Sequence, residues 1–465
     1  MPLLSSEERS RKVRFSKALL LLALLMLLAA SCGRAAVEDA PTLPATSPSE
    51  QQSTQASAPP NASETPERDV FDYSADAILA VDEIETVHPI FLIGELPENY
   101  ESVRDAYLQY TASPTIKTDF LLATQRYLTV LSDGHMGGGL LEDGRFLDAK
   151  WIAVGSRLFV ADKDGACTDT EVTEIGRVPV KDVMAQVDVY YFAENDAARQ
   201  RQYSVYCRQE EMLTLAGCRI ENNTVSLTLQ QAGSASTVAC KLVRTSRSSQ
   251  YYGADPRYII RHHMIDDVFY IDLRAFNDDK SVDDTADEIR KAIENGTYKF
   301  IIDVRDNGGG NSIVGRKLLA AMDMDVPSYG SYTRNSELSA KQRSGSGGLE
   351  LVFNERDAST AKSNDDISLA VLTNDITFSS ATMLGVWVQD GGLGTIIGQP
   401  SSNSPNAFGD MLYIRLPESG IDLPISHRQF LRPDPEADPA TLHPDIFVEL
   451  GDDALEIALE YLSGQ

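Results

Sequence analysis

Two stretches of the chain place residues of catalytic type where an apolar strand pattern gives way to a helical one. Residues 300–311 end in a run of three glycines, and residues 372–382 carry Ser379 and Ser380 at the expected start of a helix. Glycines after a buried strand let backbone N–H groups approach an anion or an oxyanion closely. A serine at a helix start is either an N-cap or a nucleophile, because the free amides favour a hydroxyl oxygen and a developing negative charge alike. These stretches alone therefore leave a structural turn and an acyl-transfer site as alternatives.

A second serine motif suggests a different chemistry. The residues from Ser359 to Lys362 match Ser-x-x-Lys, which is typical of penicillin-binding proteins and serine β-lactamases. The motif lies in a polar stretch, and no Lys-Thr-Gly follows it. A penicillin-interacting enzyme is therefore the weakest of the alternatives.

The order and spacing of four blocks resemble the tail-specific serine peptidases, the family of the carboxy-terminal processing peptidases and the tricorn protease. The blocks are DVRDNGGG at 303–310, TFSSAT at 377–382, QDGG at 389–392 and IGQP at 397–400, within a likeness that covers about residues 268–448. The resemblance implies an α/β catalytic domain with a β-rich core layer and flanking helices. It also implies a peptide or unfolded protein as substrate, and covalent chemistry that needs no metal and no other cofactor.

The resemblance assigns the reacting groups by position. Ser379 becomes the nucleophile, and the N–H groups of Ser380 and of Gly308 or Gly309 become the oxyanion hole. The carboxy-terminal processing branch uses a lysine as its base, but that position here holds Ser404. A hydroxyl cannot act as a base at neutral pH, so a Ser–Lys dyad is excluded.

Tricorn-like members use a histidine as the base, and His135 in Ser-Asp-Gly-His stands at the matching place. A histidine pKa of about 6.5 suits proton transfer near neutrality. The acidic partner is assigned to Asp438, with Asp434 and Asp133 as alternatives. The rival from another class is a peptide-binding lipoprotein that keeps the fold and has lost turnover, as the loss of the family lysine would allow.

The 465 residues divide into five expected parts. A signal peptide (1–31) and a Pro/Ser/Thr-rich tether (32–68) precede an N-terminal helical subdomain (69–148). A small β-rich module follows (149–255), where many relatives have a PDZ-like domain, and the catalytic domain is assigned to 256–465. Alternating strand and helix patterns in the last part favour an α/β layer.

The N-terminus indicates export. A basic segment precedes 13 apolar residues, 18–30, which are fewer than the roughly 20 that span a bilayer. The small residues leading to Cys32 resemble the lipobox of bacterial lipoproteins, which implies lipidation at Cys32 and a membrane anchor facing outside the cytoplasm. An uncleaved anchor is the alternative.

Charge and cysteine content exclude further classes. With 69 acidic and 41 basic residues the formal charge is −28, which repels nucleic-acid phosphates. No cysteine has a metal-ligand spacing. Export predicts one or two disulfides among the four remaining cysteines, which are Cys167, Cys207, Cys218 and Cys240. The oligomeric state stays open.

Lipidation at Cys32 predicts that Cys32→Ala releases the protein from membranes into the soluble fraction, because the acyl chains are then missing. Fractionation of cells expressing each form measures this. A variant that stays membrane-bound with its N-terminus intact would show that residues 18–30 are an uncleaved anchor.

Overall fold

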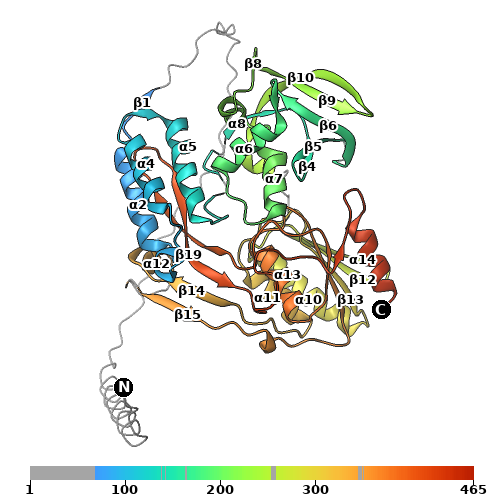
Figure 1. The fold of residues 1–465 in the computed structure, drawn as a ribbon. Coiled ribbons are helices and arrows are strands. Elements are labelled where there is room, and N and C mark those ends of the chain that lie inside the picture. Colours follow the sequence, from blue (N-terminus) through green and yellow to red (C-terminus); the bar gives the residue numbers. More distant parts are fainter. Residues whose placement is uncertain are drawn as a thin grey trace, which may run out of the picture. The chain divides into compact units, whose positions relative to one another are not determined.

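The structure, a computed structural model, describes most of the chain after the expected tether (Figure 1). The described residues are 69–137, 139–141, 143–162, 165–252, 258–343, 348 and 350–465. The expected signal peptide, Cys32 and the tether lie outside them. Glu67–Gln465 forms one compact unit. Within the described ranges, no helix has the length and apolar character to cross a membrane.

The residues after the expected tether form a group of helices. The elements are β1 (Val70–Phe71), α2 (Ser74–Val87), α3 (Ile90–Ile93), α4 (Tyr100–Thr111), β2 (Thr115–Ile116), α5 (Lys117–Leu128) and the 3-10 helix η1 (Thr129–Leu131). Apolar residues at helical spacing, such as Ala77, Val81 and Ile84 of α2, face a common core. This core also contains Leu412 and Ile425, so the helices pack on strands from the other end of the chain.

The middle of the chain is an antiparallel sheet with helices. Its strands are β3 (Asp143–Leu147), β4 (Trp151–Val154), β5 (Arg157–Ala161), β6 (Cys167–Ile175), β7 (Val178–Pro179), β8 (Ile220–Glu221), β9 (Thr224–Gln231) and β10 (Ser234–Ser246), and its helices are α6 (Val180–Tyr190), α7 (Asp196–Tyr206), α8 (Glu210–Leu215) and α9 (Arg247–Tyr252). The main strand order is β3-β10-β9-β6-β5-β4. β3 lies in the range assigned to the helical subdomain, yet it pairs with β10 and so belongs to this sheet. We call the part from β3 to α9 the middle module.

The expected disulfides are wrong for this structure. All four cysteines of the described chain are free thiols. Cys207, Cys218 and Cys240 are buried in the apolar core of the middle module, where each sulfur packs as a small apolar group. Burial raises the pKa of the Cys207 thiol, so it stays protonated and unreactive.

A six-stranded sheet carries the two stretches of catalytic type. Its order is β11 (Ile260–Ile265), β12 (Val268–Leu273), β13 (Lys299–Asp303), β16 (Ser368–Thr373), β17 (Thr395–Gly398) and β20 (Ile446–Phe447). β11 is antiparallel to β12, and every other pairing is parallel. Continuous apolar runs such as Phe300-Ile301-Ile302 suit a sheet that is covered on both faces.

Helices cover both faces of this sheet (Figure 1). One face packs against α10 (Lys280–Glu294), α11 (Ile313–Ala321) and α13 (Ser380–Asp390), with Phe300 and Trp387 in the shared core. The other face packs against α14 (Ala454–Ser463), and Ile301 and Ala458 belong to the same apolar core. The predicted α/β class, with a β-rich core layer and flanking helices, is confirmed.

A second, four-stranded sheet connects this layer to the N-terminal helices. Its order is β15 (Leu351–Asn354), β14 (Gly330–Arg334), β19 (Asp422–Leu431) and β18 (Phe408–Arg415), and the short helices α12 (Glu337–Gln342) and η2 (Ala358–Thr360) lie in its connections. The β18–β19 hairpin packs against α2 and the segment after α5 through Leu412, Ile425 and Leu131. That packing brings His135 to the edge of the six-stranded sheet that carries Ser379.

Candidate active site

The glycine run and Ser379 meet at one edge of the six-stranded sheet. β13 and β16 are parallel neighbours, with Asp303 opposite Leu372, so the turns that follow them leave the sheet side by side. Gly309 has φ +95°, and a Cβ there would lie 2.7 Å from the Cβ of Ser379. The close approach of the two turns therefore requires glycine at this position.

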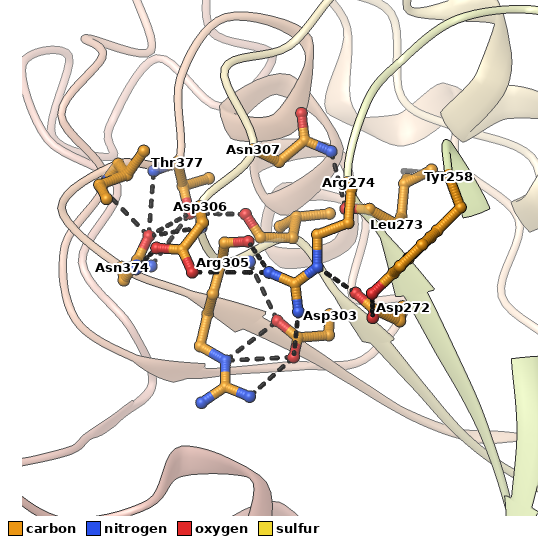
Figure 2. Close-up of polar contacts among 12 residues, drawn as sticks. Tyr258, Asp272, Leu273, Arg274, Asp303, Arg305, Asp306, Asn307, Asn374 and Thr377 are labelled. Carbon is orange, nitrogen blue, oxygen red and sulfur yellow. Dashed lines mark hydrogen bonds and ion pairs between the residues drawn. The ribbon is translucent and has the colours of Figure 1, made fainter. Parts of the chain in front are cut away.

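Hydrogen bonds tie the two turns together (Figure 2). The backbone N–H of Asp306 donates to Asn374 Oδ1 over 3.0 Å, and Asn374 Nδ2 donates to Asp306 Oδ1 over 2.8 Å. Thr377 Oγ1 donates to the carbonyl of Val304, and Asn307 Nδ2 donates to that of Leu273. The turn before Ser379 is thus fixed to the glycine turn at several points.

Charged groups hold the strand ends beneath these turns. Arg305 Nη2 donates to the buried carboxylate of Asp303 over 2.7 Å. Arg274 Nη1 donates to the carbonyl of Arg305 over 2.9 Å and lies 3.5 Å from Asp306 (Figure 2). Buried charge of this kind is stable only when it is paired, so the arginines fix where the glycine turn begins.

Ser379 has the backbone of a strained turn rather than that of a helix cap. Its φ is 52° and ψ is −123°, which is a sparsely populated conformation for a residue with a side chain. Its hydroxyl makes no capping bond to α13. Its N–H donates to Asn403 Oδ1 over 2.9 Å, which holds the strained residue in place. Of the two alternatives for this serine, the geometry favours the nucleophile.

His135 meets Ser379 although 244 positions separate them in the chain: Nε2 lies 3.0 Å from the serine Oγ. The ring packs against Phe378 with centroids 4.7 Å apart. Burial lowers the pKa of His135, which the Asp133 carboxylate partly opposes. The imidazole is therefore neutral at pH 7, and with its proton on Nδ1 it presents Nε2 as an acceptor to the serine.

Asp133 is the carboxylate beside His135. Its Oδ1 accepts the backbone N–H of His135 over 2.8 Å and lies 4.0 Å from Nδ1 of the ring. Its Oδ2 accepts from Ser426 Oγ over 2.6 Å and lies 3.2 Å from His88 Nε2. His88 Nδ1 accepts the N–H of Ile90, so its Nε2 carries the proton and donates to Asp133.

These contacts keep Asp133 ionised. Burial alone would raise its pKa, but the hydrogen bond from His88, the electrostatic influence of the His88 and His135 rings and the hydrogen bond from Ser426 hold the pKa below its ordinary value. A negative charge thus lies beside the imidazole ring of His135.

The structure does not bring Asp438 or Asp434 to this pair. Asp438 Oδ2 lies 3.0 Å from Nε2 of the exposed His443. Asp434 accepts the N–H of Glu436 through its side chain. Of the three carboxylates considered from the sequence, Asp133 is the one that contacts His135.

Two backbone amides remain available for an oxyanion. The N–H of Gly309 donates to Asn307 Oδ1 over 2.8 Å and is already used. Among the hydrogen bonds of the described residues, none takes up the N–H of Gly308 or of Ser380. Of the backbone N–H groups expected to form the oxyanion hole, those of Gly308 and Ser380 therefore remain as candidate donors.

Two depressions share His135 and Ser379 in their linings. One has a volume of about 500 Å³ and includes Tyr329, Met383 and Phe430 in its lining. The other has about 710 Å³ and reaches Gly308, Leu140 and the middle module. Both are lined by His135 and Ser379, so substrate residues on either side of a scissile bond have room.

The site contains three polar residues that sequence reasoning missed, which are His88, Glu194 and Asn403. Glu194 accepts from Asn403 Nδ2 over 2.5 Å and from the N–H of Ser404 over 2.6 Å. Ser404, at the family's lysine position, donates its hydroxyl to the carbonyl of Pro439. No local pattern marks these residues, because each acts on a segment far away in the sequence.

Other candidate groups are placed away from this chemistry or are already occupied. Ser359 donates to Asp357, and Lys362 pairs with Asp323 on the surface, so the Ser-x-x-Lys residues do not meet each other.

Asp133, His135 and Glu194 bring ligand atoms within 4.8 Å of one another, a set that could hold a metal ion. Both carboxylates already accept hydrogen bonds on both of their oxygens.

Comparisons with known proteins point to one family. Residues 267–443 match the model of peptidase family S41, which confirms the resemblance to the tail-specific peptidases. Comparison with curated proteins finds no match.

Solved structures of CPAF share the fold. Mature CPAF is similar with a TM-score of 0.57 and 14% identity, over 84% of this chain and 95% of that one. Mature CPAF complexed with lactacystin gives a TM-score of 0.58 and 14% identity, over 84% of this chain and 97% of that one. The photosystem II D1 C-terminal processing protease gives a TM-score of 0.42 and 14% identity, over 83% of this chain and 99% of that one. At these identities the likeness to CPAF shows the fold alone.

Gly309→Ala tests the close approach of the two turns. The added Cβ must displace Ser379 or Phe378, so turnover should fall by about 10²-fold. The matched control is Gly296→Ala, where φ is +90° and nothing lies within 4 Å of the new Cβ. Both variants lose about 1–2 kcal/mol of stability from the left-handed backbone. Steady-state kinetics measures the turnover of both variants. Equal turnover in the two would contradict the close packing of the glycine turn against the Ser379 turn.

Proposed function

We propose, from the match of residues 267–443 to peptidase family S41, that this protein is a serine endopeptidase of the tricorn-like tail-specific type. The family match supports serine peptidase activity. The observation that carries the proposal is the 3.0 Å contact between His135 Nε2 and Ser379 Oγ, which supplies a base where the family's lysine is absent.

The proposed reaction is acyl transfer through Ser379. His135 Nε2 takes the hydroxyl proton while Oγ attacks the peptide carbonyl, and the N–H groups of Gly308 and Ser380 stabilise the oxyanion. Asp133 stabilises the imidazolium through space. His135 then gives the proton to the leaving amine, and water hydrolyses the acyl-enzyme with His135 again as base.

The proposed substrate is a peptide or an unfolded protein, and the proposed setting is outside the cytoplasm. The two depressions that share Ser379 support cleavage within a chain rather than only at an end. The lipobox-like sequence before Cys32 and the Pro/Ser/Thr-rich stretch after it support a lipid anchor on a tether.

The second candidate is a peptide-binding lipoprotein without turnover. Ser404 at the lysine position is the observation in its favour. The two candidate functions differ in one requirement. A serine peptidase needs a base in contact with Ser379, and a peptide-binding protein does not.

Ser379→Ala and His135→Ala should each lower turnover of an unstructured peptide substrate by roughly 10⁴–10⁶-fold, because nucleophile and base act as a unit. For the same reason, the double variant should be little worse than either single one. A fluorophosphonate probe should label the wild type at Ser379 and His135→Ala far more slowly, and Lys362→Ala serves as the control with normal rates. Normal cleavage by His135→Ala would contradict the mechanism, and a wild type without labelling and cleavage would favour the binding protein.

Asp133→Asn should lower kcat by about 10²–10⁴-fold, because the imidazolium loses its counter-charge. The Asp133 carboxylate opposes the burial that lowers the pKa of His135. Without it the ring protonates only at lower pH, so the acid limb of the kcat/KM profile should move to lower pH. Asp438→Asn is the matched control and should leave kcat and the pH profile of kcat/KM unchanged. If Asp438→Asn changes them and Asp133→Asn does not, Asp438 is the acidic partner.

A further inference from the structure

The loop between α6 and α7 of the middle module reaches into the candidate active site. Glu194 in this loop accepts the N–H of Gly134 over 3.0 Å, next to His135, and also contacts the loop of residues 401–404. The neighbouring Asn195 donates to the carbonyls of Ser401 and Ala440. The module is thus attached to both segments that surround Ser379 and His135.

A short chain of hydrogen bonds connects Glu194 to the nucleophile. Asn403 Nδ2 donates to Glu194 Oε2 over 2.5 Å, while Asn403 Oδ1 accepts the N–H of Ser379 over 2.9 Å. The Glu194 bond fixes which way the Asn403 amide faces. Because Ser379 is held at φ 52°, its N–H partner must be in place for the strained turn to persist.

We infer that Glu194 is a positioning residue: its carboxylate, supplied by the middle module, holds the Ser379 turn through Asn403 and the His135 segment through Gly134. This inference rests on the proposed function. It makes the middle module part of the catalytic unit, since without it each side of the Ser–His pair loses one of its supports.

The role requires the ionised form. Oε1 accepts from Gly134, and Oε2 accepts from both Asn403 and Ser404, so a proton on either oxygen faces an N–H donor and breaks a bond. Among the described residues, Asp133 and His135 bring their side-chain polar atoms within 4.8 Å of those of Glu194, and the charged side chains that line the same depression are Lys117, Asp143, Arg247, Arg415 and Asp422. Burial, with a smaller contribution from Asp133, raises the pKa of Glu194 to about 7.

Activity and the contribution of Glu194 to stability should therefore change in opposite directions with pH. The pKa of Glu194 is higher in the folded chain than its ordinary value of about 4.5, so proton binding favours folding. The contribution is complete below about pH 4.5 and is lost as the pH rises through 7. Turnover needs the carboxylate and rises over the same interval.

The test compares Glu194→Gln with Glu171→Gln, the same change in the same module at a residue that pairs with Arg157. Glu194→Gln should lower kcat by about 10²-fold with KM little changed, since substrate contacts remain. The acid limb of its residual kcat should move below that of the wild type, because only His135 then titrates. Asn403→Ala should lower kcat similarly, and the double variant should be little worse than either single one.

Hydrogen exchange gives a readout that does not depend on activity. In Glu194→Gln the amides of residues 132–137 and 399–406 should exchange faster than in the wild type, and in Glu171→Gln they should not. If the wild type is active and Glu194→Gln keeps its kcat, pH profile and exchange rates, the inference about Glu194 is overturned and the proposed function stands. An inactive wild type would overturn the proposed function, and the exchange result would still decide whether Glu194 holds these two segments.

Discussion

The fully buried carboxylate of Asp133 is the constraint on which the site depends. A buried charge is stable only when its oxygens are paired, and Asp133 obtains partners from three separate segments. His88 comes from the end of α2, Ser426 from β19, and the third donor is the backbone of His135 itself. The carboxylate can be buried only after the N-terminal helices and the β18–β19 hairpin have packed together. The same packing places the imidazole next to Ser379, so the contact between His135 and Ser379 depends on that packing.

No single segment of the chain contains the whole candidate site. The six-stranded sheet supplies Ser379 and the amides, because parallel neighbours β13 and β16 end at one edge. The helices supply His135, and the middle module supplies Glu194. Strain at Ser379 persists because Gly309 lies against its side chain and Asn403 accepts its N–H. Such a site keeps its geometry only while all three parts remain docked.

The local features were predictable from the sequence, and the long-range ones were not. Strand, glycine run and serine lie within short windows whose apolar pattern and turn residues determine the conformation, so the α/β class and the two turns follow from composition and spacing. His135 was found only through a family resemblance, because nothing near residue 135 indicates a partner 244 positions away. Asp438 was favoured from its place in the family resemblance, whereas the structure pairs it with His443. His88, Glu194 and Asn403 gave no signal, since a buried polar residue is recognised only by its partners. The expectation of disulfides failed because export permits disulfides without requiring them, and the four cysteines of the described chain are free thiols.

The most direct test of the account is the structure of the protein with a fluorophosphonate bound covalently. The account predicts a bond to Ser379 Oγ, with the phosphonyl oxygen about 2.7–3.1 Å from the N–H groups of Gly308 and Ser380. His135 should remain beside the adduct with Asp133 behind it. An adduct on another residue, or a phosphonyl oxygen directed away from both amides, would contradict the proposed nucleophile and oxyanion hole.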